Sequence, residues 1–132
     1  MRPLRSIALA ILLTGGFAGA QAPDWAQAST IEIDMANFNF TPDMVNLKHG
    51  QPYRLHFVNK ARGGHDFAAR EFFAAATIAP EDRGHIRDGE VRLAGGETAD
   101  LRLVAPAAGS YQAHCSHFMH SSFGMKARIV VQ

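Results

Sequence analysis

Hydrophobic and polar residues alternate along most of the chain. In "TIEIDMA" (30–36), Ile31, Ile33 and Met35 alternate with polar residues, which is the period of a strand with one buried face. The alternation returns in "MVNLK", "YRLHFVN", "EVRLA", "TADLRLVA", "SYQAHC" and "ARIVV", with glycine and proline between several of them. Many short strands separated by turn residues predict an all-β fold, an antiparallel sandwich or barrel.

One segment departs from this pattern. "FAAREFFAAATIAP" (67–80) is rich in alanine, and Phe72 and Ala76 are spaced to share one face of a helix. Pro80 would end such a helix. We therefore expect a short helix inserted between two strands, with its phenylalanines packed on the sandwich.

Residues 1–22 have the layout of a secretory signal peptide. Two arginines precede a short apolar run, and Ala-x-Ala patterns end at Ala20 and Ala22. The run is too short to span a bilayer, so we expect cleavage and no stable membrane insertion afterwards, the alternative being an uncleaved anchor. The sequence thus predicts an exported, periplasmic protein with a single domain at 23–132.

The charge balance and the cysteine count narrow the possible functions. The chain has 13 Lys and Arg against 12 Asp and Glu, and loss of Arg2 and Arg5 with the leader leaves 11 against 12. No basic run is present, so nucleic acid is not an expected partner. The single cysteine, Cys115, cannot form an internal disulfide. In an exported protein it needs another role: intermolecular pairing, reactivity or metal binding.

Soft metal-ligand types gather around that cysteine. "HCSHFMHSSFGM" (114–125) holds three of the seven histidines and two of the five methionines. Cys115, His120 and Met125 follow the spacing C-x4-H-x4-M, and a thiolate, an imidazole and a thioether suit copper that cycles between Cu(I) and Cu(II). A trigonal site needs a second imidazole, and "NKARGGHDF" offers His65 after a strand and a Gly-Gly pair.

In these segments the chain resembles the cupredoxins, the small blue copper proteins. "FNFTPDMVNLKHGQPYRLHFVNKARGGHDF" is similar to the first half of the family's domain, and "GSYQAHCSHFMHSSFGMKARIVV" is similar to its C-terminal ligand loop. The resemblance implies a Greek-key antiparallel β-sandwich that binds one type 1 copper ion. His65, Cys115 and His120 would be the equatorial ligands and Met125 the weak axial ligand.

The resemblance also implies a role. The chain is most similar to periplasmic cupredoxins of copper tolerance or respiratory electron transfer. It would then be a monomeric one-electron carrier and not an enzyme. A redox partner protein, such as a cytochrome or a copper enzyme, would dock near His120.

Two features depart from the family's pattern. Asp66 stands where members commonly place the asparagine that ties the two ligand loops together, and its carboxylate would lower the reduction potential by favouring Cu(II). The second feature is a pair of histidines, His114 and His117, on either side of Cys115 in the sequence. They could bind a second, labile metal ion or shuttle protons; the alternative is that they are solvated or hydrogen-bonded loop residues. With no His-x-His pair and one cysteine, neither a trinuclear nor a binuclear copper centre is expected.

Three alternatives stay open at this point. The same ligands would serve copper tolerance, sequestration or delivery, which the additional histidines and Met119 fit. A thiol enzyme would use Cys115 with a neighbouring histidine, but it would leave Met125 and His65 unexplained. Zinc would be adventitious, because a thioether is a poor zinc ligand.

The remaining candidates are less specific. Phe118, Met119 and Phe123 either pack the ligand loop on the sandwich or form an apolar collar around His120 where a partner docks. Three histidines lie far along the chain from the sulfur ligands and are not expected to bind metal: His49, His56 and His85.

Overall fold

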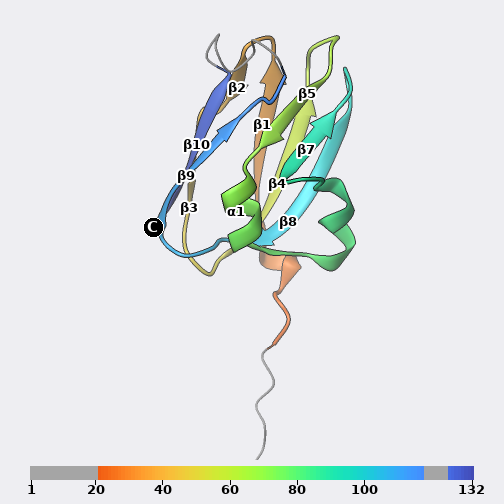
Figure 1. Ribbon diagram of the computed structural model, residues 1–132. Coiled ribbons are helices and arrows are strands. Elements are labelled where there is room, and N and C mark those ends of the chain that lie inside the picture. Colours follow the sequence, from red (N-terminus) through yellow and green to blue (C-terminus); the bar gives the residue numbers. More distant parts are fainter. Residues whose placement is uncertain (1–20, 118–124) are drawn as a thin grey trace, which may run out of the picture.

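Two five-stranded sheets pack face to face in the computed structural model, which describes residues 21–117 and 125–132 (Figure 1). The first sheet has the order β2-β1-β4-β8-β6, with β1 Ser29–Ala36, β2 Asn39–Thr41, β4 Pro52–Asn59, β6 Thr77–Ile78 and β8 Thr98–Val104. The second has the order β3-β10-β9-β5-β7, with β3 Met44–Leu47, β5 His65–Ala68, β7 Glu90–Leu93, β9 Gly109–His114 and β10 Lys126–Val131.

Every second side chain of the main strands is buried between the two sheets, and the packing of these side chains holds the sheets together. In β8 the alternate residues Ala99, Leu101 and Leu103 are buried, and β1, β4 and β10 follow the same pattern. The expected all-β sandwich is confirmed. The pairs β1–β4 and β3–β10 run parallel, however, so both sheets are mixed and not purely antiparallel as the sequence suggested.

The expected helix is confirmed, with a different end. Helix α1 is Arg70–Ala75, and its Phe72 ring packs on Tyr111 of β9 with centroids 5.6 Å apart. Pro80 does not end this helix: it begins a 3-10 helix, η2 Pro80–His85. Proline fits there because its fixed φ suits a first helical turn, where its missing N–H is not needed.

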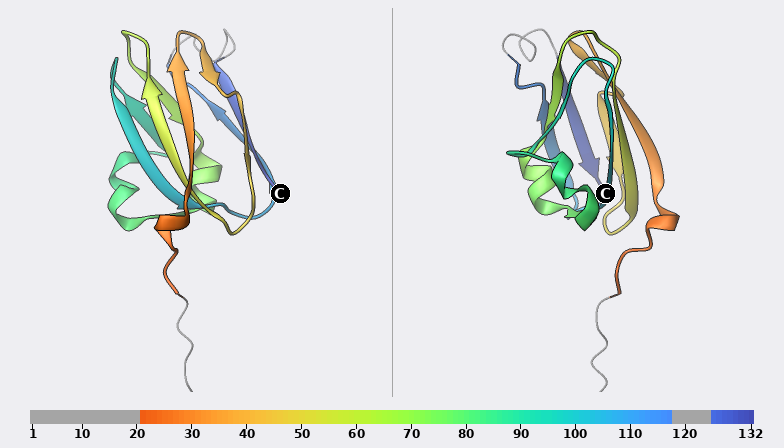
Figure 2. Two further views of the ribbon diagram at one scale, coloured as in Figure 1. Left: turned by 180° about the vertical axis from the view of Figure 1, so that it is seen from behind. Right: turned by 90° about the vertical axis from the view of Figure 1, so that its right-hand side faces the viewer.

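The helices lie away from the end of the sandwich where β5 begins. The α1 and η2 helices and a further 3-10 helix, η1 Trp25–Gln27, gather toward the opposite end in all three views (Figures 1 and 2). The end that carries Cys115 and the start of β5 is therefore formed by strand ends and turns. Among residues 21–117 and 125–132, no helix is long and apolar enough to cross a membrane.

Candidate metal centre

Cys115 and Met125 lie side by side where β9 and β10 meet. The antiparallel register of these strands ends at the pair of His114 and Lys126. One residue further, the Cys115 N–H donates to the Met125 carbonyl at 3.1 Å, and both side chains are fully buried. The hairpin thus brings together two sulfur side chains that are ten positions apart in the sequence.

His65 faces the same sulfur. It follows strand β4 and the Gly63–Gly64 pair, and it is itself the first residue of β5, next to β9 in the sheet. Side chains alternate along a strand, so His65 points inward on the same side as Phe67, whose ring packs against Phe40 and Phe57 of the other sheet. The buried His65 places its Nδ1 3.9 Å from Cys115 Sγ.

This separation fits two ligands of one metal ion. An ion bonded to nitrogen at about 2.0 Å and to sulfur at about 2.3 Å would see the two atoms at an angle of roughly 130°. That value is close to the angle of about 120° in a trigonal His₂Cys site. With a thioether beside them, the donors suit a soft ion such as copper better than they suit zinc.

A buried asparagine fixes the segment that leads to His65. The Asn59 Nδ2 donates to the carbonyls of Gly63, Leu93 and Ala94 at 2.9–3.1 Å, and its Oδ1 accepts from the Ala61 N–H at 3.0 Å. Asn59 is 1 % exposed; its bond to the Leu93 carbonyl is buried, and the other three bonds are partly buried. Sequence reasoning missed this residue, because an asparagine at the end of a strand carries no specific signal.

Gly95, in the turn between β7 and β8, lets the segment between Asn59 and His65 pack closely against that turn. A Cβ added at Gly95 would overlap the carbonyl oxygen of Arg62. Within the expected Gly-Gly pair, only the second residue meets the site: a Cβ at Gly64 would touch the His117 ring at 3.5 Å, whereas one at Gly63 would meet nothing within 4 Å.

The thiol of Cys115 is held in a dry environment. Burial raises the pKa of Cys115, while backbone N–H groups of Asp66 and His117 that hydrogen-bond the sulfur act in the opposite direction. Burial is the larger effect, so binding of a metal ion as the thiolate must release a proton.

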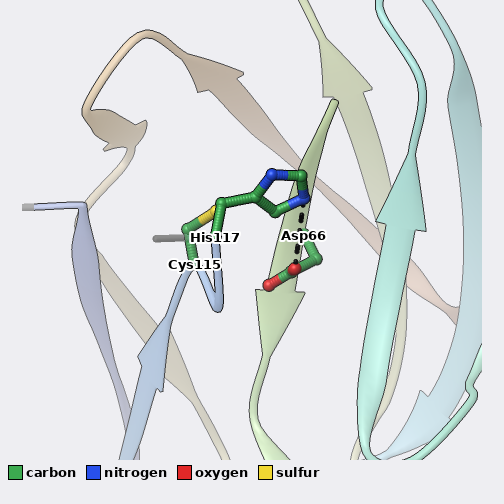
Figure 3. A group of neighbouring side chains, drawn as sticks. All are labelled: Asp66, Cys115 and His117. Carbon is green, nitrogen blue, oxygen red and sulfur yellow. Dashed lines mark ion pairs between the residues drawn. The ribbon is translucent and has the colours of Figure 1, made fainter. Parts of the chain in front are cut away.

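Asp66 connects the two segments of the site (Figure 3). It is the second residue of β5 and points to the outer face of the sheet, where it accepts hydrogen bonds from the N–H of Ser116 at 2.7 Å and from the Ser116 hydroxyl. On the same side, His117 Nε2 lies 3.6 Å from Asp66 Oδ2. The ligand atoms of Asp66, Cys115 and His117 all lie within 4.8 Å of one another.

Not every candidate falls on the described residues. His120, Phe118, Met119 and Phe123 lie outside them, so of the four copper ligands expected from the sequence the structure describes the positions of His65, Cys115 and Met125. His117, which the sequence left open between a metal ligand and a loop residue, lies beside Asp66. This proximity joins positions 51 residues apart and has no local signal in the sequence.

Two of the other histidines make structural hydrogen bonds. His49 Nδ1 lies 2.8 Å from the Pro106 carbonyl, and His56 Nδ1 lies 2.7 Å from Asp100 Oδ1. His85 is the last residue of η2. Neither these histidines nor the exposed His114 belongs to the group of ligand atoms that the described residues bring together at Cys115.

Residues 6–131 match the family described as the cupredoxin-like domain. The chain belongs to this family. Similar solved structures include an auracyanin from Roseiflexus castenholzii, with 20% identity, a TM-score of 0.59 and coverage of 80% of this chain and 98% of the other. Auracyanin A from Chloroflexus aurantiacus, described as a "blue" copper protein, has 19% identity and a TM-score of 0.58 over 80% of this chain and 99% of its own.

A larger protein shares the cupredoxin fold. The match to a multi-copper oxidase from Pseudomonas thermotolerans has 22% identity and a TM-score of 0.63, and it covers 86% of this chain but only 32% of the oxidase. At these identities the similarity concerns the fold. No protein of curated function matches this cupredoxin in sequence.

Proposed function

We propose that this cupredoxin is an exported, periplasmic electron carrier that holds one type 1 copper ion with His65, Cys115, His120 and Met125. The observation that carries the proposal is the 3.9 Å separation of His65 Nδ1 and Cys115 Sγ, both buried, with the Met125 side chain buried beside the cysteine. The fold of the auracyanins, one of which is described as a blue copper protein, supports it.

The protein's part in this function is to hold the donors still. Bound copper would supply a one-electron couple between Cu(I) and Cu(II). His65 and Cys115 sit at or next to the ends of neighbouring strands of one sheet, and Asn59 and Asp66 fix the segments around them. Donors held in this way need not move when the charge of the site changes, so little energy is spent on rearrangement.

Burial has a second consequence for the site. Cys115, Met125 and His65 are buried away from water. The cysteine sulfur is therefore protected from oxidation, and the low polarity of its surroundings strengthens each electrostatic contact in the site. The domain transforms no substrate in this proposal and is not an enzyme. A redox partner protein would dock near His120. The exposed Phe38 ring, in the turn between β1 and β2, lies at the same end of the sandwich as Cys115 and offers such a partner apolar surface.

Copper reconstitution tests the proposal. One equivalent of Cu(II) added to the metal-free protein is expected to give an intense thiolate-to-copper absorption band in the visible and the EPR signal of a type 1 centre. Cys115→Ala and His65→Ala should abolish the band, whereas His85→Ala, an exposed histidine in η2, should leave it unchanged. His120→Ala and Met125→Leu test the other two ligands.

The opposite result is equally clear. A colourless protein, or a weak spectrum typical of nitrogen and oxygen ligands alone, would contradict a type 1 centre. Zinc binding and thiol chemistry at Cys115 would then have to be tested.

A second function, copper tolerance or delivery, is favoured by the third ligand group next to Cys115. The pair of His117 and Asp66 offers ligands through which copper could be released to another protein, which an electron carrier does not need. A competing chelator separates the two functions: a carrier should keep its copper for hours, whereas a delivery protein should lose it quickly.

A further inference from the structure

Two imidazoles that differ in exposure lie close to Cys115. On its inner side is His65, which is buried, with Nδ1 3.9 Å from the sulfur. On its outer side is His117, whose side chain is 44% exposed. The centroids of the two rings are 6.2 Å apart, so an ion needs to move only a few ångströms to exchange one ring for the other.

The outer side has a negative charge as well as an imidazole. Asp66 is 1% exposed, and its Oδ2 faces His117 Nε2 at 3.6 Å (Figure 3). Its own position is fixed by the two hydrogen bonds from Ser116, and the His117 ring lies near Gly64, where an added Cβ would be 3.5 Å from it. We call Asp66, Cys115 and His117 the outer cluster; their ligand atoms all lie within 4.8 Å of one another.

We propose that the outer cluster is a transient copper position through which the ion enters and leaves the buried site. The inference rests on the proposed function, because it assumes that copper resides at Cys115 and His65. His117 is the exposed member of the cluster and meets the ion first, while the Asp66 carboxylate offsets the charge of the ion as its water is removed.

The transfer requires no oxidant or reductant. His117 Nε2 and Asp66 replace two water molecules on Cu(II), then the Cys115 S–H bond breaks, the Cu–S bond forms and the proton leaves to the solvent. His65 and the other proposed ligands then replace His117, Asp66 and the remaining water molecules, with the Cys115 thiolate bound throughout the last exchange. A stepwise path of this kind avoids moving a bare cation into a dry site, which is costly.

Copper exchange kinetics test this inference. Metal-free protein is mixed with Cu(II) in a stopped-flow instrument, and the rise of the charge-transfer band gives the uptake rate; a chelator in excess gives the release rate. His117→Asn should slow both rates by at least about tenfold and by the same factor, because a transient ligand lowers the barrier in both directions. Affinity and the final spectrum should stay the same.

The neighbouring His114 provides the control. It is an exposed histidine on the other side of Cys115, and His114→Asn should exchange copper at the wild-type rate. His117→Gln repeats the test with a side chain of different length, so that a folding defect in one variant does not decide the result.

The outcomes separate this inference from the proposed function. If wild type forms the band and both His117 variants exchange copper within about twofold of its rates, the inference is wrong. A changed final spectrum would make His117 a resident ligand and would also overturn it. A wild-type protein without the band would overturn the proposed function and the inference with it.

Discussion

Both carboxylate oxygens of Asp66 accept hydrogen bonds from Ser116, one from the backbone N–H and one from the hydroxyl. Asp66 directly follows His65, and Ser116 directly follows Cys115. The pair therefore connects the strand that carries the imidazole with the segment that carries the thiol. It also places a nearly fully buried carboxylate beside the proposed copper ion, where solvent screens its charge poorly.

We predict that Asp66→Asn raises the reduction potential of the copper-loaded protein. The ionised carboxylate favours Cu(II) over Cu(I), so its removal should favour the reduced form. Asparagine retains an oxygen that can accept the Ser116 N–H. A tenfold change in the ratio of the two oxidation states corresponds to about 59 mV, and we expect a rise of roughly that size, measured by redox titration of the visible band.

A charge removed elsewhere provides the comparison. Asp100→Asn deletes a carboxylate on β8, in the other sheet, where it is paired with Arg54 and His56. It should shift the potential much less. An unchanged or lower potential in Asp66→Asn would contradict the role given to this carboxylate.

Asn59→Ala should destabilise the metal-free protein by about 2 to 3 kcal/mol. The substitution leaves buried carbonyl groups without the Nδ2 donor, and each such group bears a desolvation cost. Urea unfolding measures the change. Asn46→Ala, an exposed asparagine on β3, is the matched control and should have little effect; equal losses in both variants would show that Asn59 has no special role.

Gly95→Ala should also destabilise the fold, by about 1 to 3 kcal/mol, because the new methyl group would overlap the Arg62 carbonyl and force a backbone shift. Gly63→Ala in the adjacent turn introduces the same methyl group where nothing lies within 4 Å. Thermal unfolding of the two variants should separate them clearly. A Gly95→Ala variant as stable as Gly63→Ala would rule out the close approach of the two turns.

Two acidic side chains make stability depend on pH. Hydrogen bonds from Arg102 lower the pKa of Asp82, and hydrogen bonds from Arg54, with a further one from His56, lower the pKa of Asp100. A carboxyl group whose pKa is lower in the folded state stabilises the fold above its unfolded pKa, about 3.9. The contribution is lost as the pH falls through the folded value, so the free energy of unfolding should decrease from about pH 5 downward.

Asp82→Asn tests this pH dependence. We expect the free energy of unfolding to fall by about 1 to 2 kcal/mol at neutral pH. Asp82 accepts hydrogen bonds from the backbone N–H and from the guanidinium group of Arg102, and the partial exposure of the arginine side chain limits the size of the effect. The decrease below pH 5 should be smaller than in wild type. Asp88→Asn, at an exposed turn, should retain the wild-type pH profile; two parallel profiles for Asp82→Asn and wild type would contradict the assignment.

The sequence predicted the longer strands that have one buried face, and it missed a fully buried strand and two very short ones. β1, β4 and β8 show the alternation clearly because the residues on one face are buried and those on the other face are exposed or partly exposed. β5 was missed, since all four of its residues, His65–Ala68, are buried and no alternation is left to see. β2 and β6, with 3 and 2 residues, are too short to show a period.

At the site, spacing on one loop was informative and contacts between strands were not. The separation of Cys115 from Met125 in the sequence was enough to expect them together, because two strands flank their loop. The part played by Asn59, and the proximity of His117 to Asp66, became visible only in three dimensions. Their partners, Leu93 and Asp66, come from strands that the sequence does not place next to them.

The backbone bond from Cys115 to Met125 closes the base of their loop, and the pairing of β9 with β10 continues from there to Gly109 and Val131. The strand pairing of the described sandwich thus lies outside the segment between the two sulfur residues. We expect substitutions in that segment to leave this strand pairing in place. Natural variation in such a protein can therefore adjust the chemistry of the metal separately from the stability of the domain, as two traits that evolve at different rates.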